Sequence, residues 1–523
     1  MAEATTHPLP EQVMMSESRT TRPSRATGGR RHAPGKAPRA GAVHLTAECW
    51  PYARTGGLGE AVSGLASFQA AAGAPTAIVM PLYRQVREST SNLERVGSAF
   101  EVTVGHRAER AWLYRTVTES GPNVFFIEHP GYFERSGIYG DDAGDYADNG
   151  VRFAFFCMAA LSVLPDIAPQ AQVLHAHDWH TAIAPVYLRT TFAANPWHHR
   201  LATVLSVHNA GFQGHFPPEA MTELGVPQHL YHWRAFEWYG RMNVLKGGLA
   251  FSDSVVTVSP THARELRTPE GGFGLHDAFT TLGERLVGIL NGIDTKLWDP
   301  AKDPHIPATF SRDELAGKKK CKAELQRSYG LPEHARIPVF GMSARLAAQK
   351  GFDLVLGADL LGSSDAQFVF LGAGDVRYQE ALADLAAQAP DRVAVEFAFT
   401  DRLEHRLLAG ADLLLMPSLY EPCGLTQMRA QRYGAIPLAR RVGGLQDSIR
   451  DGETGFLFDA YEPAALEQAI GDAVGRRHDT AAWTTMMRHA MAERFGWDQA
   501  VIRYHEVYQR ALASRIADPV HPG

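Results

Sequence analysis

Short apolar runs alternate with longer amphipathic segments along most of this chain, and the alternation occurs in two separate series. Runs of about four to eight residues without polar alternation predict strands buried on both faces. The longer segments between them, such as residues 59–72 and 150–164, predict helices. This alternation favours parallel sheets covered by helices on both faces. The expected strands are AVHLTA, TAIVMPL, NVFFIEH, QVLHAHD, ATVLSVHN and SVVTVSP in the first series, then IPVFGMSARL, AQFVFLGAGD, RVAVEFAF, ADLLLMPSLY and, as the last, AIPLAR.

The two series predict two doubly wound α/β domains, and a length of 523 residues is too great for a single core. We expect the first domain over residues 41–295, the second over 335–495 and a connecting region over 296–334. Residues 496–523 are expected to form a C-terminal helix that packs back on the first domain. Because such sheets bind ligands beyond the carboxyl ends of their strands, we expect the ligand site in the cleft between the domains.

Residues 1–40 differ in composition from the rest of the chain. They are rich in Ala, Pro, Ser, Thr and Gly, with no acidic residue after Glu17, which predicts a disordered tail. The tail has no apolar stretch of the kind found in secretory signals. We expect a cytoplasmic protein. A plastid location stays open, because transit peptides have a similar composition.

The overall composition excludes several classes of protein. A hydrophobic fraction of 45% and a charged fraction of 21% are typical of globular proteins, and a net charge of −6 does not favour a nucleic-acid partner. The most apolar stretch, residues 153–164, is shorter than the roughly 20 residues that cross a bilayer, so we expect a core helix and no membrane partner. Four dispersed cysteines predict neither a disulfide scaffold nor a cysteine zinc site.

Polar strand ends in the first domain mark a candidate site. The segment HAHDWH, residues 175–180, is reminiscent of the HxHxDH motif of metal-dependent hydrolases, but its aspartate, Asp178, is displaced by one place. We therefore favour a polar strand end that lines the cleft over a metal site. His208 ends the neighbouring strand ATVLSV, so that both groups are expected to face one crevice.

The second domain offers cations and a carboxylate at corresponding positions. Arg345 and Lys350 flank the turn after its first strand, and such a pair of cations suits a diphosphate. Glu421 follows another buried strand and is expected to precede a helix, which places a carboxylate and free backbone N–H groups in the same cleft. Glycine turns at 55–59 and 372–375 would let the backbone approach a ligand.

These motifs together resemble those of the bacterial glycogen synthase and plant starch synthase family of retaining glycosyltransferases. The resemblance covers the chain from about residue 41. The motifs that carry it are TGGLG (55–59), HAHDWH (175–180), SVHNAGFQG (206–214), LNGID (290–294), SARLAAQKG (343–351), GAGD (372–375) and PSLYEPCGLTQ (417–427).

The resemblance implies the GT-B fold, two Rossmann-like domains facing a cleft, and transfer of glucose from ADP-glucose to the non-reducing end of an α-1,4-glucan. The cations are expected to replace a metal ion, so no cofactor is predicted; the oligomeric state stays open. The implied catalytic residues are His208, Asp178, Arg345, Lys350 and Glu421. The implied donor-binding residues are Arg54, Gly57, Asn291, Gly374, Phe399, Cys423, Gly424, Leu425 and Thr426.

Two residues depart from the family pattern in the first glycine turn. Arg54 stands where the family usually has lysine, and Glu60 stands where it usually has aspartate. These changes leave open another GT-B enzyme with a different donor, such as UDP-glucose, or a catalytically silent glucan-binding protein. A sucrose synthase relative and a phosphorylase are further alternatives, although no segment suggests the pyridoxal-phosphate lysine that a phosphorylase needs.

Overall fold

The structure is a computed structural model that describes residues 39–116, 121–141, 144–362 and 364–517. Residues 1–38 of the predicted tail lie outside this range. The first domain contains a nine-stranded sheet in the order β14-β13-β9-β8-β1-β2-β5-β4-β3. Its strands are β1 (Ala42–Leu45), β2 (Thr76–Pro81), β3 (Leu93–Val104), β4 (Arg107–Thr116), β5 (Asn123–Glu128), β8 (Val173–His177), β9 (Ala202–Val207), β13 (Ser254–Thr257) and β14 (Leu286–Gly288).

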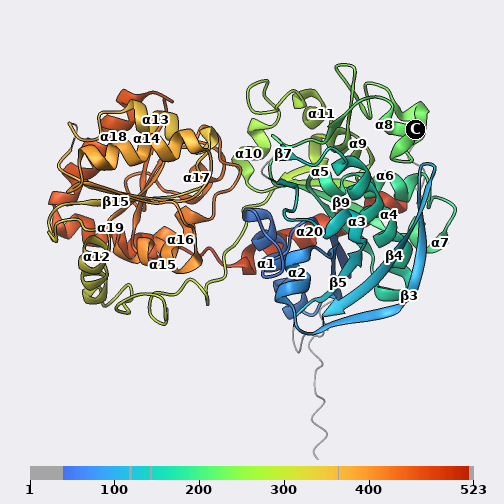
Figure 1. Cartoon of the computed structure of the whole chain (residues 1–523), viewed down its shortest axis with the longest axis horizontal. Helices are drawn as coiled ribbons and strands as arrows, with labels where there is room; N and C mark the ends of the chain where they lie inside the picture. Colours follow the sequence, from blue (N-terminus) through green and yellow to red (C-terminus); the bar gives the residue numbers. More distant parts are fainter. Residues whose placement is uncertain (1–38, 117–120, 142–143, 363, 518–523) are drawn as a thin grey trace, which may run out of the picture. The chain divides into compact units, whose positions relative to one another are not determined.

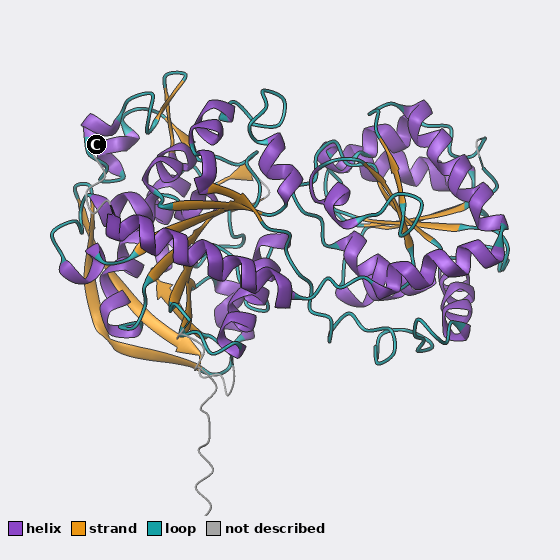
Figure 2. Ribbon diagram, turned by 180° about the vertical axis from the view of Figure 1, so that it is seen from behind, coloured by secondary structure: helices purple, strands orange, loops and turns teal. Residues whose placement is uncertain are grey.

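The central strands of this sheet form where the apolar runs predict them. Every residue of β1, β2, β8, β9 and β13 is buried, and these strands pair in parallel. Helices cover both faces of the sheet (Figure 2). The main helices of this domain are α1 (Gly57–Ala71), α2 (Arg84–Ser89), α4 (Asn149–Ile167), α6 (Ile183–Arg189), α9 (Val244–Phe251), α10 (Pro260–Glu265) and α11 (His276–Thr281).

Short elements complete the first domain. They are α3 (Pro130–Phe133), β6 (Gly140–Asp141), β7 (Gly144–Asp145), α5 (Asp178–Thr181), α7 (Pro196–His199), β10 (His215–Phe216), α8 (Ala220–Glu223), η1 (Gln228–Leu230), β11 (Glu237–Trp238), β12 (Arg241–Asn243) and η2 (Gly283–Arg285).

One edge of the first sheet differs from the prediction of purely parallel strands. β3 and β4 form an antiparallel pair, and β4 also runs antiparallel to β5. The strand sequences LERVGSAFEVTV and RAERAWLYRT mix charged with apolar residues, and much of each strand is exposed. They carry no continuous apolar run, so the pattern that identifies buried strands does not detect them.

The second domain holds a six-stranded parallel sheet in the order β17-β16-β15-β18-β19-β20. Its strands are β15 (Val339–Ser343), β16 (Gln367–Leu371), β17 (Val393–Glu396), β18 (Leu413–Met416), β19 (Ile436–Arg440) and β20 (Phe456–Phe458). The prediction that AIPLAR is the last strand is wrong, because β20 follows it. β20 is too short, at three residues, to stand out as an apolar run.

Helices lie on both faces of the second sheet, with α13, α14 and α18 on one side and α15 and α16 on the other (Figure 1). The helical elements of this part of the chain are α12 (Ala316–Ser328), η3 (Ala348–Lys350), α13 (Phe352–Gly357), α14 (Val376–Gln388), α15 (Asp401–Gly410), α16 (Thr426–Arg432), α17 (Gly443–Ser448), α18 (Pro463–His478) and α19 (Thr480–Ala492).

Helix α12 lies in the region predicted as a connection and packs against α15 of the second domain. Its Lys318 is buried, and Nζ donates to the backbone carbonyls of Ala411 and Tyr433 at 3.0 and 2.8 Å. The final described helix, α20 (Trp497–Ala517), packs against α1 and β9 of the first domain. Tyr508 and other apolar residues of α20 join a buried cluster with Ala61 and Leu65 of α1.

Helix α4 contains the most apolar stretch of the sequence. By length and composition it could cross a membrane. Most of its residues are buried inside the first domain, against β2, β3 and β5 among other elements. The structure therefore assigns it the role of a core helix.

Candidate active site

Lys350 and Glu421 form the centre of the candidate site in the second domain. Nζ of Lys350 donates to Oε2 of Glu421 at 2.6 Å, and the hydroxyl of Ser418 donates to the same oxygen at 3.2 Å. Glu421 is buried while Lys350 is half-buried. The buried carboxylate therefore holds the ammonium group in place from the interior of the domain. Because both bonds use Oε2, Oε1 can accept a hydrogen bond from a ligand.

Close backbone packing shapes the turns beside this pair. Gly351 has φ 82°, and a Cβ there would lie 2.1 Å from a backbone oxygen. Gly374, in the GAGD turn, has φ 157°, and its Cβ would lie 2.3 Å from the carbonyl oxygen of Leu346. Only glycine avoids both contacts. Arg345 precedes Leu346 and is exposed, so it lies next to the GAGD turn at the end of two adjacent strands, β15 and β16.

The segment after Glu421 packs tightly. Cys423 is buried, and burial raises the pKa of its thiol to about 12, so the thiol stays protonated and unreactive. Gly424 has φ 69°, and a Cβ there would lie 2.4 Å from the side-chain oxygen of Gln427. Gln427 belongs to α16, which begins at Thr426. Leu425 lies 3.8 Å from where a Cβ on Gly57 would be. The glycine turn of the first domain thus approaches this segment.

Asp178 and His208 meet at the ends of β8 and β9. Oδ1 of Asp178 accepts hydrogen bonds from the backbone N–H groups of His208 at 2.7 Å and Asn209 at 3.4 Å. Asp178 has a left-handed backbone with φ 57°, a conformation that is uncommon outside glycine and is found at functional sites. Burial raises the pKa of Asp178 to about 7. The structure thus brings the two predicted strand ends into direct contact.

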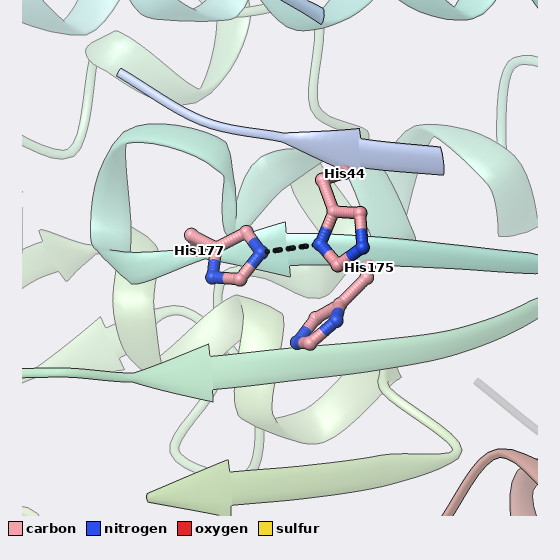
Figure 3. A group of neighbouring side chains, drawn as sticks. All are labelled: His44, His175 and His177. Carbon is pink, nitrogen blue, oxygen red and sulfur yellow. Dashed lines mark hydrogen bonds between the residues drawn. The ribbon is translucent and has the colours of Figure 1, made fainter. Parts of the chain in front are cut away.

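The histidines of the HAHDWH motif separate into two groups. His175 and His177 lie beside His44 of β1, and one ring nitrogen from each of the three lies within 4.8 Å of the others (Figure 3). His180 instead stacks on Tyr139, with ring centroids 4.6 Å apart. Three imidazoles at this spacing suit a metal ion. All six of their ring nitrogens, however, have protein partners at 2.7–3.0 Å, which a metal would have to displace.

Glu48 holds the first glycine turn and was missed by the sequence reasoning. Its carboxylate accepts from the backbone N–H of Thr55 at 2.6 Å, the Thr55 hydroxyl at 2.8 Å and the hydroxyl of Tyr139 at 2.5 Å. The residue is buried. The available signal was its position directly after the first apolar run, the same strand-end pattern that marked Asp178.

The two departures from the family pattern belong to one ionic network that joins the domains. Arg54 pairs with Glu60 at 2.8 Å and with Asp401 at the start of α15. Glu60 also pairs with Arg429 of α16, which contacts Glu404 at 3.0 Å. The structure thus places Arg54 between carboxylates from both domains, where its fork can bind two partners at once.

Tyr420 links the two halves of the candidate site. Its hydroxyl lies close to the side-chain oxygen of Asn209, next to His208, because a Cβ on Gly211 would be 3.1 Å from both atoms. Its ring lies against Phe273 of the first domain, with centroids 5.0 Å apart. Because Tyr420 directly precedes Glu421, this contact brings the Asp178–His208 group near the Lys350–Glu421 pair.

Two further predicted donor-binding residues occupy different environments. Asn291 is buried, and among the residues that the structure describes its Oδ1 has no hydrogen-bond partner. A buried acceptor without a partner is unfavourable, and the role of Asn291 in donor binding stays a prediction. Phe399 lies just before α15 and exposes 44% of its surface.

Comparisons with known proteins agree with this architecture. Residues 42–281 match the family model of the starch synthase catalytic domain, and residues 324–488 match that of glycosyl transferases group 1. A glycogen synthase of Anaeromyxobacter dehalogenans (strain 2CP-1) is 41% identical over 481 residues, covering 90% of this chain and 99% of that protein. A glycogen synthase of Syntrophotalea carbinolica is 39% identical over 472 residues, covering 89% and 97%.

A solved structure of a starch synthase is also similar to this chain. The catalytic domain of starch synthase IV from Arabidopsis thaliana, bound to ADP and acarbose, superposes with a TM-score of 0.83 at 31% identity. The superposition covers 91% of this chain and 100% of the other.

Proposed function

This chain belongs to the family of glycogen synthases and starch synthases, glycosyltransferases with the GT-B fold, and we propose that it elongates an α-1,4-glucan by transferring glucose from ADP-glucose. The acceptor is the non-reducing end of glycogen or a maltooligosaccharide, the anomeric configuration is retained and ADP is released. The donor assignment follows from the family resemblance.

The observation that carries the proposal is the Lys350–Glu421 pair beside exposed Arg345. Two cations at the carboxyl edge of the sheet suit a diphosphate, while Oε1 of Glu421 suits a sugar hydroxyl. On the other side of Tyr420, Asp178 and His208 supply acceptors for the same sugar. This division of cationic and hydroxyl-binding groups matches the two parts of a nucleotide-sugar.

The chemistry assigned to these residues is stabilisation of the leaving group. Negative charge grows on the diphosphate as the glycosidic bond breaks, and Lys350, which Glu421 holds in place, and Arg345 stabilise it. The acceptor hydroxyl attacks from the face that ADP leaves and passes its proton to the departing diphosphate oxygen, which retains the configuration through an ion-pair-like transition state. We propose that no metal ion is required, since the two cations supply the positive charge; activity should persist in EDTA.

The decisive experiment incubates the protein with maltooligosaccharide and labelled nucleotide-sugars. Labelled glucan should form from ADP-glucose faster than from UDP-glucose under matched conditions. Equal or faster transfer from UDP-glucose would overturn the donor assignment. Glucan binding without transfer from any donor would instead identify a silent binding protein.

A further inference from the structure

A continuous line of hydrogen bonds, buried except at its last member, runs beneath the candidate site and ends at His208. Oε1 of Gln69, on α1, lies 2.8 Å from Nε2 of His44. Nδ1 of His44 lies 3.0 Å from Nε2 of His177 (Figure 3), and Nδ1 of His177 lies 3.0 Å from Nε2 of His208. These three histidines stand on β1, on β8 and directly after β9, which are neighbours in the sheet. We call the four side chains the Gln69 relay.

The other end of Gln69 is anchored by the last described helix. Its amide nitrogen donates to the hydroxyl of Tyr508, on α20, at 3.0 Å. That hydroxyl lies 2.7 Å from Nδ1 of His175, whose Nε2 lies 2.7 Å from the hydroxyl of Ser206. Gln69 and Tyr508 are both buried. In this arrangement the amide nitrogen of Gln69 faces Tyr508 and its oxygen faces His44.

All three histidines of the relay are neutral near pH 7. Burial lowers the pKa of His44 and His208 to about 4, and the pKa of His177 lies well below its ordinary value for the same reason. A neutral imidazole has one N–H and one lone pair. In a line of neutral rings, each ring must accept on one side and donate on the other, so the first partner determines the direction of every bond.

We propose that Gln69 is a positioning residue that determines which ring nitrogen of His208 carries the proton. A carbonyl oxygen can only accept, so Nε2 of His44 holds a hydrogen and its Nδ1 accepts from Nε2 of His177. Nδ1 of His177 then accepts from Nε2 of His208. His208 is left with a lone pair on Nδ1. A reversed Gln69 amide would reverse every bond and turn Nδ1 into a donor.

The relay has a consequence for substrate, which rests on the proposed function. His208 is the half-buried member of the relay, at the end of β9 beside Asp178. With Nδ1 unprotonated, its ring accepts a hydrogen bond from a glucose hydroxyl and does not compete as a donor. Gln69 and Tyr508 thus influence sugar binding without contacting the sugar.

Nitrogen NMR of histidine-labelled protein tests the relay directly. Long-range ¹⁵N–¹H spectra distinguish the two neutral tautomers, and the His208 signal is identified by its loss in His208→Gln. We expect the Nε2–H form of His208 in the wild-type protein and a mixture of both forms in Gln69→Met and Tyr508→Phe. An Nδ1–H form in the wild type, or a pattern unchanged in both variants, would overturn the proposal.

Kinetics supply the second readout. Gln69→Met and Tyr508→Phe should each lower kcat with ADP-glucose about tenfold, equivalent to about 1.4 kcal/mol, with thermal stability measured in parallel. Tyr187→Phe is the matched control, because Tyr187 is another buried tyrosine of the first domain whose hydroxyl donates to a backbone carbonyl outside the relay. An equal loss of kcat in the control would contradict a specific role. If the wild type transfers no glucose, the proposed function fails while the NMR result still decides the relay.

Discussion

Lys350 and Glu421 are 71 residues apart in the sequence, yet Nζ and Oε2 lie 2.6 Å apart. The buried carboxylate orients the cation, and the cation compensates the charge of the carboxylate. A pair of this kind is costly to break from one side, because the remaining charge is left without its partner.

We expect Lys350→Ala and Arg345→Ala each to lower kcat by about two to three orders of magnitude, the loss seen when one preorganised charge-stabilising donor is removed. The loss should fall on kcat more than on donor KM, since the charge develops in the transition state. Steady-state kinetics with ADP-glucose measure both. Lys319→Ala is the control, because Lys319 is an exposed lysine on α12; near-wild-type kcat in Lys350→Ala would contradict the assignment.

Gly374→Ala should destabilise the second domain by about 1–3 kcal/mol and impair activity, because the new Cβ would lie 2.3 Å from a backbone oxygen at φ 157°. Gly475→Ala makes the same change inside α18, where nothing lies within 4 Å of the added carbon. There it should stabilise the helix by about 0.5–1 kcal/mol. Thermal unfolding measures the stability of both variants. A Gly374→Ala protein as stable as Gly475→Ala would show that the GAGD turn can adapt.

Arg54→Lys should keep kcat within a few-fold of the wild type and change mainly donor KM. An ammonium group keeps the charge, but it lacks the fork with which Arg54 binds Glu60 and Asp401 together. The contact between the domains would therefore weaken without loss of the cations at the diphosphate site. Asp401→Asn, which alters the same contact from the other domain, should shift donor KM in the same direction. Abolished kcat in Arg54→Lys would place the diphosphate against the first domain.

Acid should destabilise the folded protein through its buried histidines. Burial lowers the pKa of His44 and His208 to about 4, whereas each titrates near 6.5 in an unfolded chain. Between these values the unfolded chain binds more protons, so stability is lost as the pH falls from about 6.5 to 4. The loss is about 1.4 kcal/mol per pH unit for each histidine.

Asp178 opposes this trend and offers a variant to test it. Its raised pKa of about 7, against 3.8 in the unfolded chain, makes the folded protein bind the extra proton as the pH falls from 7 to 4. Asp178→Asn removes this opposing effect, so its stability should decline more steeply with acid than that of the wild type. Urea unfolding at pH 7, 6 and 5 measures both slopes. A shallower slope in the variant would contradict the origin assigned to the shift.

The accuracy of the sequence prediction depended on how each segment is buried. Strands such as Ala202–Val207 are buried along their whole length, so most of their residues are apolar and the sequence pattern identifies them. Strands Leu93–Val104 and Arg107–Thr116 are half-exposed at a sheet edge, and their mixed composition concealed them. Three-residue β20 is below the length at which a run is informative.

The same contrast applies to the candidate site. Asp178 and His208 follow strands directly, and Lys350 and Glu421 lie in the segments that follow β15 and β18, so the common edge of each parallel sheet predicts their place. The bond between Gln69 and Tyr508 joins residues 439 positions apart. No local pattern specifies such a pair, because the partners are brought together by the packing of α20 on α1.

That packing has a consequence for synthesis. Chains emerge from the ribosome at about 5–20 residues per second, N-terminal segments first. The first domain must therefore wait for residues 497–517, which are translated after the whole second domain, before Ala61, Leu65 and Gln69 gain their final neighbours. A nascent chain carries an unfinished first domain for the time taken to translate roughly 200 further residues. A premature stop anywhere in the second domain would release a protein in which neither domain is complete.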